Sequence, residues 1–146
     1  MLYHTPVEIR QFRMTDYEAV IALWQLAGEG VHLRRSDTRA EIEKKVQRDP
    51  DLFLLSEQDG HVVGAVMGGF DGRRGMVYHL ATDPAYRCLG IGSALMETLE
   101  TRLRAKGCRK VYLLVTNENR QAQQFYEQRG WEDMTTALRC YGKEMA

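Results

Sequence analysis

The sequence has few cysteines, no excess of charge of one sign and no long apolar run, and each absence excludes a class of protein. Its 146 residues include only three cysteines, Cys88, Cys108 and Cys140, and no two of them form a CxxC pair. A disulfide framework and a zinc site are therefore not expected. Three free thiols are typical of a reducing compartment, so we expect a cytoplasmic protein that binds no metal.

The charge balance and the hydropathy argue against two kinds of partner. Lysine and arginine number 20 and so do aspartate and glutamate, which gives zero net charge, whereas nucleic-acid-binding domains usually carry a basic excess. The longest uncharged apolar stretch, residues 62–70, holds three glycines and is about half as long as a membrane span. The first residues also lack the apolar stretch of a signal peptide. We expect neither nucleic acid nor a membrane as partner.

The composition, with 44% hydrophobic and 27% charged residues, is that of a soluble globular protein. No linker or low-complexity segment interrupts it, so we expect a single domain over residues 1–146. In the first third, periodicity predicts a strand over 7–13, a helix over 17–27 capped by Thr15 or Asp16, and a charged helix from Ser36-Asp37 to Arg48 or Asp49.

The rest of the chain predicts a meander of three strands and then alternating elements. The strands cover 52–57, 61–70 and 75–82, and the Asp-Gly pair in 58–60 is a strong hairpin signal. A helix over 91–106 carries apolar residues four apart. A strand over 111–116, a helix over 119–129 and short strands around Trp131 and over 137–141 complete an α+β order, βααβββαβαββ.

The strand-to-helix junction after Thr82 carries the clearest chemical signal. Arg87, Gly90 and Gly92 precede or begin a helix, whose N-terminal N–H groups attract anions such as phosphate. No Lys-Ser or Lys-Thr follows, which excludes a P-loop, and the third glycine of a Rossmann fingerprint is missing. An ordinary glycine-rich turn before an amphipathic helix explains this segment equally well.

A second motif begins at Asn119. Asn119, Ala122 and Tyr126 fall on one face of the predicted helix, and the small side chain of Ala122 leaves room for a ligand there. A helix whose aromatic pair, Phe125-Tyr126, simply packs in a core is the alternative interpretation. Neither motif is decisive by itself.

Together and in this order, the two motifs resemble the GNAT superfamily of N-acetyltransferases. The acetyl-CoA signature of that family is Arg or Gln, two residues, Gly, one residue, then Gly or Ala. The segment that follows it is Asn, two residues, Ala, three residues, Tyr, three residues, Gly and an aromatic residue. This sequence matches the two patterns at Arg87, Gly90 and Gly92 and at Asn119, Ala122, Tyr126, Gly130 and Trp131.

A narrower likeness is to the small bacterial YpeA-type subgroup of that superfamily. It is carried by Phe53-Leu54, Val63-Gly64, residues 66–69 and Asp71-Gly72. The resemblance implies a mixed, mostly antiparallel sheet of about seven strands flanked by four helices. It also implies acetyl-CoA as co-substrate and direct attack of an amine on the thioester carbonyl.

The resemblance also implies a set of cofactor-binding residues. Backbone groups of Leu80 and Thr82 are expected to pair with the pantetheine arm, residues 87–92 to hold the pyrophosphate, and Asn119 to bond the cofactor. In full, the expected cofactor-binding residues are Leu80, Ala81, Thr82, Arg87, Cys88, Leu89, Gly90, Ile91, Gly92, Asn119 and Tyr126. Leu89 stands where relatives commonly carry Lys or Arg, and Cys88 replaces a common glycine, so we expect somewhat weaker cofactor binding.

Tyr126 is the predicted catalytic residue, with its hydroxyl directed at the sulfur as general acid. The reference pKa of a thiol lies about 1.5 units below that of a tyrosine, which corresponds to only about 2 kcal/mol. The base that must deprotonate the amine is not assigned. The family's usual carboxylate positions are occupied by Met76 and Leu114, so the candidates are His79, Glu118, Glu29 and bound water.

Acceptor specificity is expected from residues 24–37, between and within the first two helices. The weak candidates for acceptor contact are Trp24, Arg34, Arg35 and His79. The two arginines are suited to clamping an acceptor carboxylate, but a solvated basic pair before a helix is the simpler interpretation. We expect His32 to be merely exposed.

We therefore predict an acetyl-CoA-dependent N-acetyltransferase that acts on a small-molecule amine or an amino acid. One alternative is acetylation of a protein N-terminus or lysine. The other is a non-catalytic acyl-CoA-binding module. The absence of the usual carboxylates favours this module, whereas the presence of Tyr126 argues against it. The resemblance to the superfamily also implies a homodimer.

Overall fold

The computed structural model describes residues 7–28, 31 and 33–145. The chain divides into two compact units, Met1–Leu114 and Val115–Ala146, which we call the N-terminal and C-terminal units and describe separately. The expected single domain over residues 1–146 therefore stays a prediction.

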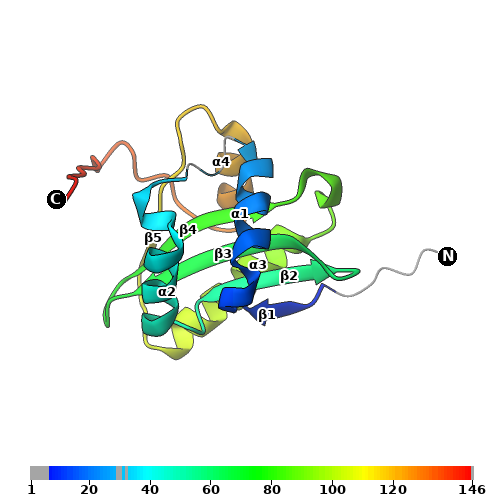
Figure 1. The fold of residues 1–146 in the computed structure, drawn as a ribbon. Coiled ribbons are helices and arrows are strands. Elements are labelled where there is room, and N and C mark those ends of the chain that lie inside the picture. The colour runs from blue at the N-terminus through cyan, green and yellow to red at the C-terminus, as the bar shows by residue number, and fades with distance from the viewer. Residues whose placement is uncertain (1–6, 29–30, 32, 146) are drawn as a thin grey trace. The chain divides into compact units, whose positions relative to one another are not determined.

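The N-terminal unit is built on a sheet of five strands in the order β1-β2-β3-β4-β5 (Figure 1). Strands β1 to β4 pair antiparallel with their sequence neighbours, and β5 pairs parallel to β4. The predicted meander is confirmed, with the bounds of β3 and β4 as predicted. The strands are β1 (Ile9–Gln11), β2 (Phe53–Gln58), β3 (His61–Phe70), β4 (Gly75–Thr82) and β5 (Val111–Leu113).

The hairpin between β2 and β3 has the predicted turn. Asp59 and Gly60 have φ values of 51° and 79°, both in the left-handed region. Two successive left-handed residues are what a two-residue hairpin loop of type I′ needs, and Asp-Gly is a preferred pair for it.

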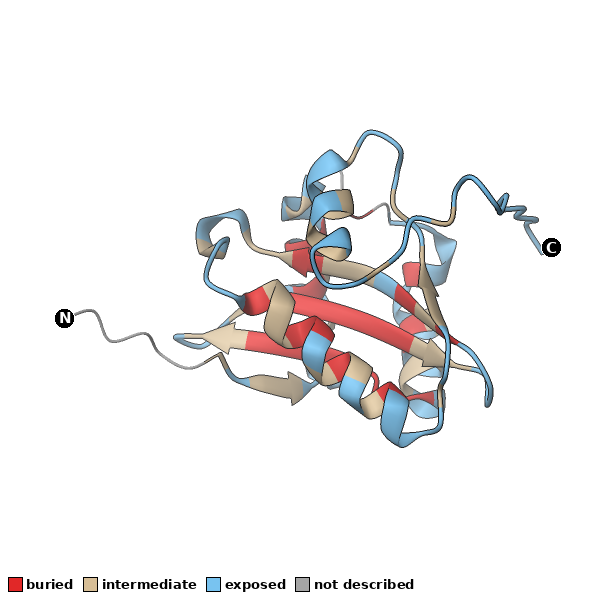
Figure 2. Cartoon of the chain, turned by 180° about the vertical axis from the view of Figure 1, so that it is seen from behind, coloured by how far each residue is buried: buried red, intermediate tan, exposed pale blue. Residues whose placement is uncertain are grey.

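Helices cover both faces of this sheet (Figures 1 and 2). On one face lie α1 (Tyr17–Leu26) and α2 (Arg39–Arg48), and on the other lies α3 (Ile91–Ala105). Short 3-10 helices η1 (Met14–Asp16), η3 (Arg35–Asp37) and η4 (Pro84–Tyr86) connect the elements. The α2 cap is Thr38, whose side chain accepts a hydrogen bond from Glu41 N, and not the predicted Ser36-Asp37.

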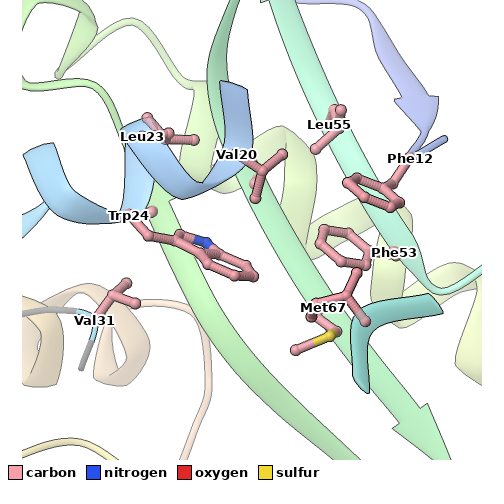
Figure 3. Close-up of a cluster of buried hydrophobic side chains, with 11 residues drawn as sticks. Phe12, Val20, Leu23, Trp24, Val31, Phe53, Leu55 and Met67 are labelled. Carbon is pink, nitrogen blue, oxygen red and sulfur yellow. The ribbon is translucent and has the colours of Figure 1, made fainter. Parts of the chain in front are cut away.

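The face toward α1 holds a cluster of buried side chains that includes both aromatic and aliphatic residues (Figure 3). Phe12 and Phe53 stack with ring centroids 4.2 Å apart, and Trp24 stacks on Phe53 at 6.1 Å. Trp24 is 1% exposed. The helix that carries it is therefore fixed to the sheet by a rigid aromatic contact.

The opposite face is close-packed against α3 because two β3 positions have no side chain. A Cβ atom on Gly64 would lie 2.5 Å from Ile91 Cγ2, and one on Gly68 would lie 2.6 Å from Leu99 Cδ1. The predicted apolar stripe of α3, Ile91, Leu95, Leu99 and Leu103, is buried in full. The sheet therefore admits α3 at a distance that no larger residue allows at these positions.

The C-terminal unit contains α4 (Arg120–Glu127) and an irregular segment that follows it. The two strands predicted around Trp131 and over 137–141 are wrong: the structure assigns no strand to residues 128–145. The expected sheet of about seven strands is wrong for the same reason, since the described residues form a sheet of five. Local bonds occupy this backbone instead, since Thr135 N donates to Asp133 Oδ1 and both Ala137 N and Leu138 N donate to Met134 O. Residues 137–145 are exposed (Figure 2), so no apolar face favours a strand there.

The described residues form no helix that is both long and apolar enough to span a bilayer.

Candidate active site

The predicted acetyl-CoA residues of the N-terminal unit lie at the C-terminal end of β4 and in the loop after it. β5 pairs with β4 only at Gly75, Met76 and Val77. From Tyr78 onward, the described part of the chain pairs β4 with β3 alone. One edge of the segment that contains Leu80, Ala81 and Thr82 is thus outside any described ladder, as the resemblance implies for a strand that receives a pantetheine arm.

A β-bulge lies in this open segment. Met67 pairs with Tyr78 and Ala65 pairs with Ala81, so the single residue Val66 faces both His79 and Leu80. His79 has a φ of 50°, a left-handed conformation that a non-glycine residue adopts at a cost of about 1 kcal/mol. The bulge breaks the alternation of side chains along β4 at this point.

Because of the bulge, the His79 side chain lies on the face that carries α1. Its ring contacts the Trp24 ring edge to face, with centroids 4.8 Å apart, and its Nε2 atom lies 2.9 Å from Asp37 Oδ1. Trp24 belongs to α1 and Asp37 to η3. The imidazole is 19% exposed and Asp37 only 4%.

Asp37 is held from several directions. Its Oδ2 atom accepts a hydrogen bond from Arg34 N at 3.0 Å, and its backbone oxygen accepts one from Tyr17 Oη at 2.9 Å. Burial opposes ionisation of this carboxyl, but the hydrogen bonds from His79 and Arg34 N outweigh it, so the pKa of Asp37 lies below its ordinary value. Asp37 is therefore an anion at neutral pH.

The loop from η4 to α3 contains the predicted pyrophosphate residues. Arg87, Cys88, Leu89 and Gly90 are all exposed. Gly90 is the N-cap of α3, with a φ of 81° and no side chain that could cap the helix. Ile91 and Gly92 are the first two residues of α3.

The backbone at position 88 has a conformation that suits glycine better than cysteine. Cys88 has a φ of 65°, which favours glycine and strains any other residue except Asn or Asp. A cysteine at this position therefore costs backbone energy. Strained positions of this kind are concentrated at functional sites.

The C-terminal unit contains the other two predicted residues. Asn119 caps α4, and its Oδ1 atom accepts a hydrogen bond from Ala122 N at 3.1 Å. Tyr126 packs edge to face against Phe125 and Trp131, with centroids 5.2 and 5.7 Å away. Burial raises the pKa of Tyr126 to about 12, so its hydroxyl keeps its proton throughout the neutral range.

Several other predicted residues are placed differently from what an acceptor site requires. Trp24 is a core residue, and its ring contacts the ring of His79. Arg34 and Arg35 are exposed at the start of η3, and the described residues offer no ion-pair partner to either guanidinium. Glu29 and His32 lie outside the described residues.

The remaining base candidate, Glu118, and the two positions where the resemblance implies a carboxylate, Met76 and Leu114, lie in different surroundings. Met76 lies in the β4–β5 ladder opposite Tyr112, and Leu114 is 68% exposed just beyond β5. Glu118 is exposed in the C-terminal unit. No three His, Cys, Asp or Glu side chains gather within the described ranges as a metal site would need.

Asp37 is the functional candidate that the sequence did not reveal. Ser36-Asp37 was interpreted as the start of a helix, yet Thr38 is itself a good cap and performs that role. Because Thr38 caps α2, Asp37 is not needed as a cap, and this is the only sign in the sequence that Asp37 has another role. Its partner His79 is 42 positions away along the chain, too far for any periodicity to connect them.

Comparisons with known proteins identify a family and relatives of this chain. The chain matches the acetyltransferase (GNAT) family over residues 10–131. It is 45% identical over 128 residues to an acetyltransferase of Pectobacterium atrosepticum, covering 86% of this chain and 88% of the relative.

Solved structures show the same fold. Ard1 from Thermoplasma volcanium has a TM-score of 0.76 and 28% identity, over 86% of this chain and 82% of that chain. The PaiA N-acetyltransferase from Thermoplasma acidophilum, solved in complex with coenzyme A, has a TM-score of 0.75 and 20% identity, over 86% of this chain and 89% of that chain.

Proposed function

Because the chain belongs to the acetyltransferase (GNAT) family, we propose that it transfers the acetyl group of acetyl-CoA to the amine of a small molecule or an amino acid. The open end of β4, followed directly by the Arg87–Gly92 loop and the α3 N-terminus, is the observation that carries this proposal. An extended edge and a helix N-terminus in succession suit a ligand with a peptide-like arm and a phosphate group.

Each part of that ligand has a complementary group in the N-terminal unit. Backbone groups of Leu80 and Thr82 are the proposed partners of the pantetheine amides, because β5 pairs with β4 only at residues 75–77 and the described residues place no strand beside this end of β4. The N–H groups of Ile91 and Gly92 and the exposed Arg87 side chain are the proposed partners of the pyrophosphate. Leu89 adds no charge there, so we expect affinity below that of relatives with a basic residue.

Tyr126 is the proposed donor to the sulfur that leaves. In the reaction the amine nitrogen forms a bond to the thioester carbon, the carbon–sulfur bond breaks, and the sulfur departs as a thiolate. With the pKa of Tyr126 near 12, proton transfer to a free thiolate is uphill by about 3.5 units, or about 5 kcal/mol. Tyr126 is therefore best suited to stabilise the developing thiolate by a hydrogen bond while the bond breaks.

The α4 cap is compatible with the role proposed for Asn119. Its Oδ1 atom serves the helix, while its amide nitrogen supplies two donors for a ligand carbonyl. One side chain can thus fix the start of α4 and bind the cofactor at the same time.

The test is release of free coenzyme A from acetyl-CoA in the presence of amino acids, polyamines, aminoglycosides or peptides. We expect turnover with one small-amine class, and a Tyr126→Phe variant with kcat lowered about 10- to 100-fold and acetyl-CoA affinity nearly unchanged. Tyr141→Phe, at a fully exposed tyrosine of the same unit, is the matched control and should behave as the wild type.

Three results would contradict parts of the proposal. Turnover with peptides alone would indicate acetylation of a protein N-terminus or lysine. Binding of acetyl-CoA without turnover of any acceptor would indicate a non-catalytic binding module. A normal kcat in Tyr126→Phe would remove Tyr126 from the mechanism. The predicted homodimer is tested separately by sedimentation.

A further inference from the structure

His79 lies next to the proposed cofactor-binding segment of β4, and its side chain is partly exposed. It is the first residue of the bulge, next to the segment of β4 that we propose binds the pantetheine arm. Its side chain is part exposed, unlike the buried core residues that surround it on the same face. A side chain at this point is next to the place where the thioester would lie if the proposed function holds.

The imidazole is fixed in orientation by two contacts on different elements. Trp24 of α1 contacts its ring, and the Asp37 carboxylate of η3 lies at Nε2. An anionic carboxylate accepts a hydrogen bond, so in the neutral ring Nε2 carries the proton and Nδ1 presents a lone pair. The arrangement is a base with a second group that holds it in one tautomer, as in other acid–base pairs.

The Asp37 side is rigid enough to serve that purpose. The titratable and charged groups that contact this pair are Arg34, through its backbone N–H and nearby charge, and Tyr17, through its hydroxyl to the Asp37 carbonyl. Both Asp37 oxygens are thereby used, one by His79 and one by Arg34 N. An imidazolium formed at His79 would be stabilised by a carboxylate that needs no rearrangement.

The reaction needs such a group because an alkyl ammonium has no lone pair. An amine with a reference pKa of about 10.4 is neutral in roughly one molecule in 2,500 at pH 7. The usual carboxylate positions of the family hold Met76 and Leu114, and neither side chain accepts a proton. Imidazole exchanges protons near neutral pH more readily than any other side chain.

We infer that His79 Nδ1 accepts the proton of the incoming ammonium group and that Asp37 is the positioning residue that holds the imidazole for it. This inference rests on the proposed acetyl transfer. The ammonium gives one proton to Nδ1, and the freed lone pair attacks the thioester carbonyl as the carbon–sulfur bond breaks. The nitrogen then loses a second proton to solvent, and the departing thiolate takes up one proton from solvent. His79 finally returns its proton to water.

The variant that tests this is His79→Asn. Asparagine tolerates a positive φ better than most residues, so the bulge is preserved, yet its amide takes up no proton. The matched control is His61→Asn, at an exposed histidine that begins β3. Thermal unfolding and acetyl-CoA affinity are measured for both variants, and both are expected to stay within about twofold of wild-type affinity.

With the acceptor that gives the fastest turnover, His79→Asn is expected to lower kcat/KM about a hundredfold at pH 7. Above pH 7 its kcat/KM should rise about tenfold per pH unit toward the acceptor pKa, because only free amine then reacts. Wild type and His61→Asn should not show that rise. A His79→Asn profile that is parallel to wild type at all pH values would overturn the inference.

A second measurement does not depend on an acceptor. Long-range proton–nitrogen NMR on labelled protein should show His79 protonated at Nε2 in its neutral form, and Asp37→Asn should remove that preference and alter the pH profile of kcat/KM. A His79 ring protonated at Nδ1 would overturn the inference even if His79→Asn failed to fold.

The two proposals fail differently. A wild-type protein that neither binds acetyl-CoA nor acetylates any acceptor disproves the proposed function, and the inference with it. A wild-type protein that acetylates an acceptor, with His79→Asn equally active at pH 7, disproves the inference alone.

Discussion

The two halves of β4 differ although they are eight consecutive residues of one strand. Residues 75–77 are paired on both sides, antiparallel to β3 and parallel to β5. Residues 79–82 pair with β3 only after a bulge, and one residue of that bulge has a left-handed backbone. We call these the scaffold half and the site half.

The difference shows how one strand serves stability and chemistry together. In the scaffold half, the backbone groups are used within the sheet, and Val77 is buried on the face toward α3. In the site half, the strand has no pairing with β5, so one of its edges is unpaired in the described residues. The bulge gives His79 a left-handed backbone and places its side chain on the face toward α1. The regular half therefore provides the stability that the irregular half lacks.

The largest expected effect comes from blocking the proposed pyrophosphate position at the start of α3, which follows the site half along the chain. Gly92→Trp places an indole at the first turn of α3, where we propose that the pyrophosphate binds, and should weaken acetyl-CoA binding at least about 100-fold, or about 2.7 kcal/mol. Calorimetry measures the affinity. Glu97→Trp, at an exposed position on the same helix, is the control and should leave it unchanged. Unchanged affinity in Gly92→Trp would refute the proposed pyrophosphate position.

A smaller effect, on stability, is expected from the scaffold half. Gly68 pairs with Val77, and a Cβ atom there would lie 2.6 Å from Leu99, which is fully buried and cannot move aside freely. Gly68→Ala should lower the free energy of unfolding by about 1–3 kcal/mol, measured with urea. Acetyl-CoA affinity of the folded protein should stay as in the wild type.

The neighbouring glycine provides the control for that substitution. A Cβ atom on Gly69 would meet Lys45 Nζ at 3.3 Å, the far end of a flexible side chain. Gly69→Ala should therefore cost less than about 0.5 kcal/mol. Equal losses in the two variants would show that close packing against α3 does not limit position 68.

Apart from the control substitutions, the smallest expected effect concerns the contact between Asp37 and His79. The pKa of Asp37 is lowered in the folded protein, so its ionised form stabilises the fold above the unfolded value near 3.8, and this contribution disappears as pH falls through the folded pKa. Asp37→Asn should cost about 1–2 kcal/mol at pH 7 because charge-assisted hydrogen bonds become neutral ones. The wild type and the variant should converge in stability at low pH, as followed by urea unfolding between pH 7 and pH 3. A constant difference would contradict the ionised Asp37–His79 contact.

Most of the N-terminal unit was predictable because local patterns coincide with its tertiary packing. The bounds of β3 and β4, the Asp59-Gly60 turn and the apolar stripe of α3 follow from alternation, turn chemistry and helical spacing. The strands expected beyond α4 were wrong because the short apolar patterns around Trp131 and over 137–141 have no strand to pair with, and residues 137–141 are exposed. A short strand has no stability of its own without a partner.

In the candidate site too, the residues of local motifs could be predicted from the sequence and the others could not. Arg87, Gly90, Gly92, Asn119 and Tyr126 are predicted from their spacing, since each belongs to a contiguous motif at a helix start or on one helix face, and their roles stay predictions. The likeness to the YpeA-type subgroup stays a prediction. The status of Trp24 as a core residue was not predictable, because amphipathic spacing does not distinguish a side chain that lines a site from one beneath it.

The sequence by itself determined the elements of the N-terminal unit and the membership of the acetyltransferase family, because both depend on residues close together in the chain. Only the tertiary structure decided that His79 meets Asp37. That contact requires one extra residue in β4 to turn the imidazole toward α1, and a Thr38 cap that leaves Asp37 unused by α2. Both conditions arise from pairing and packing between distant segments, which no local pattern of residues specifies.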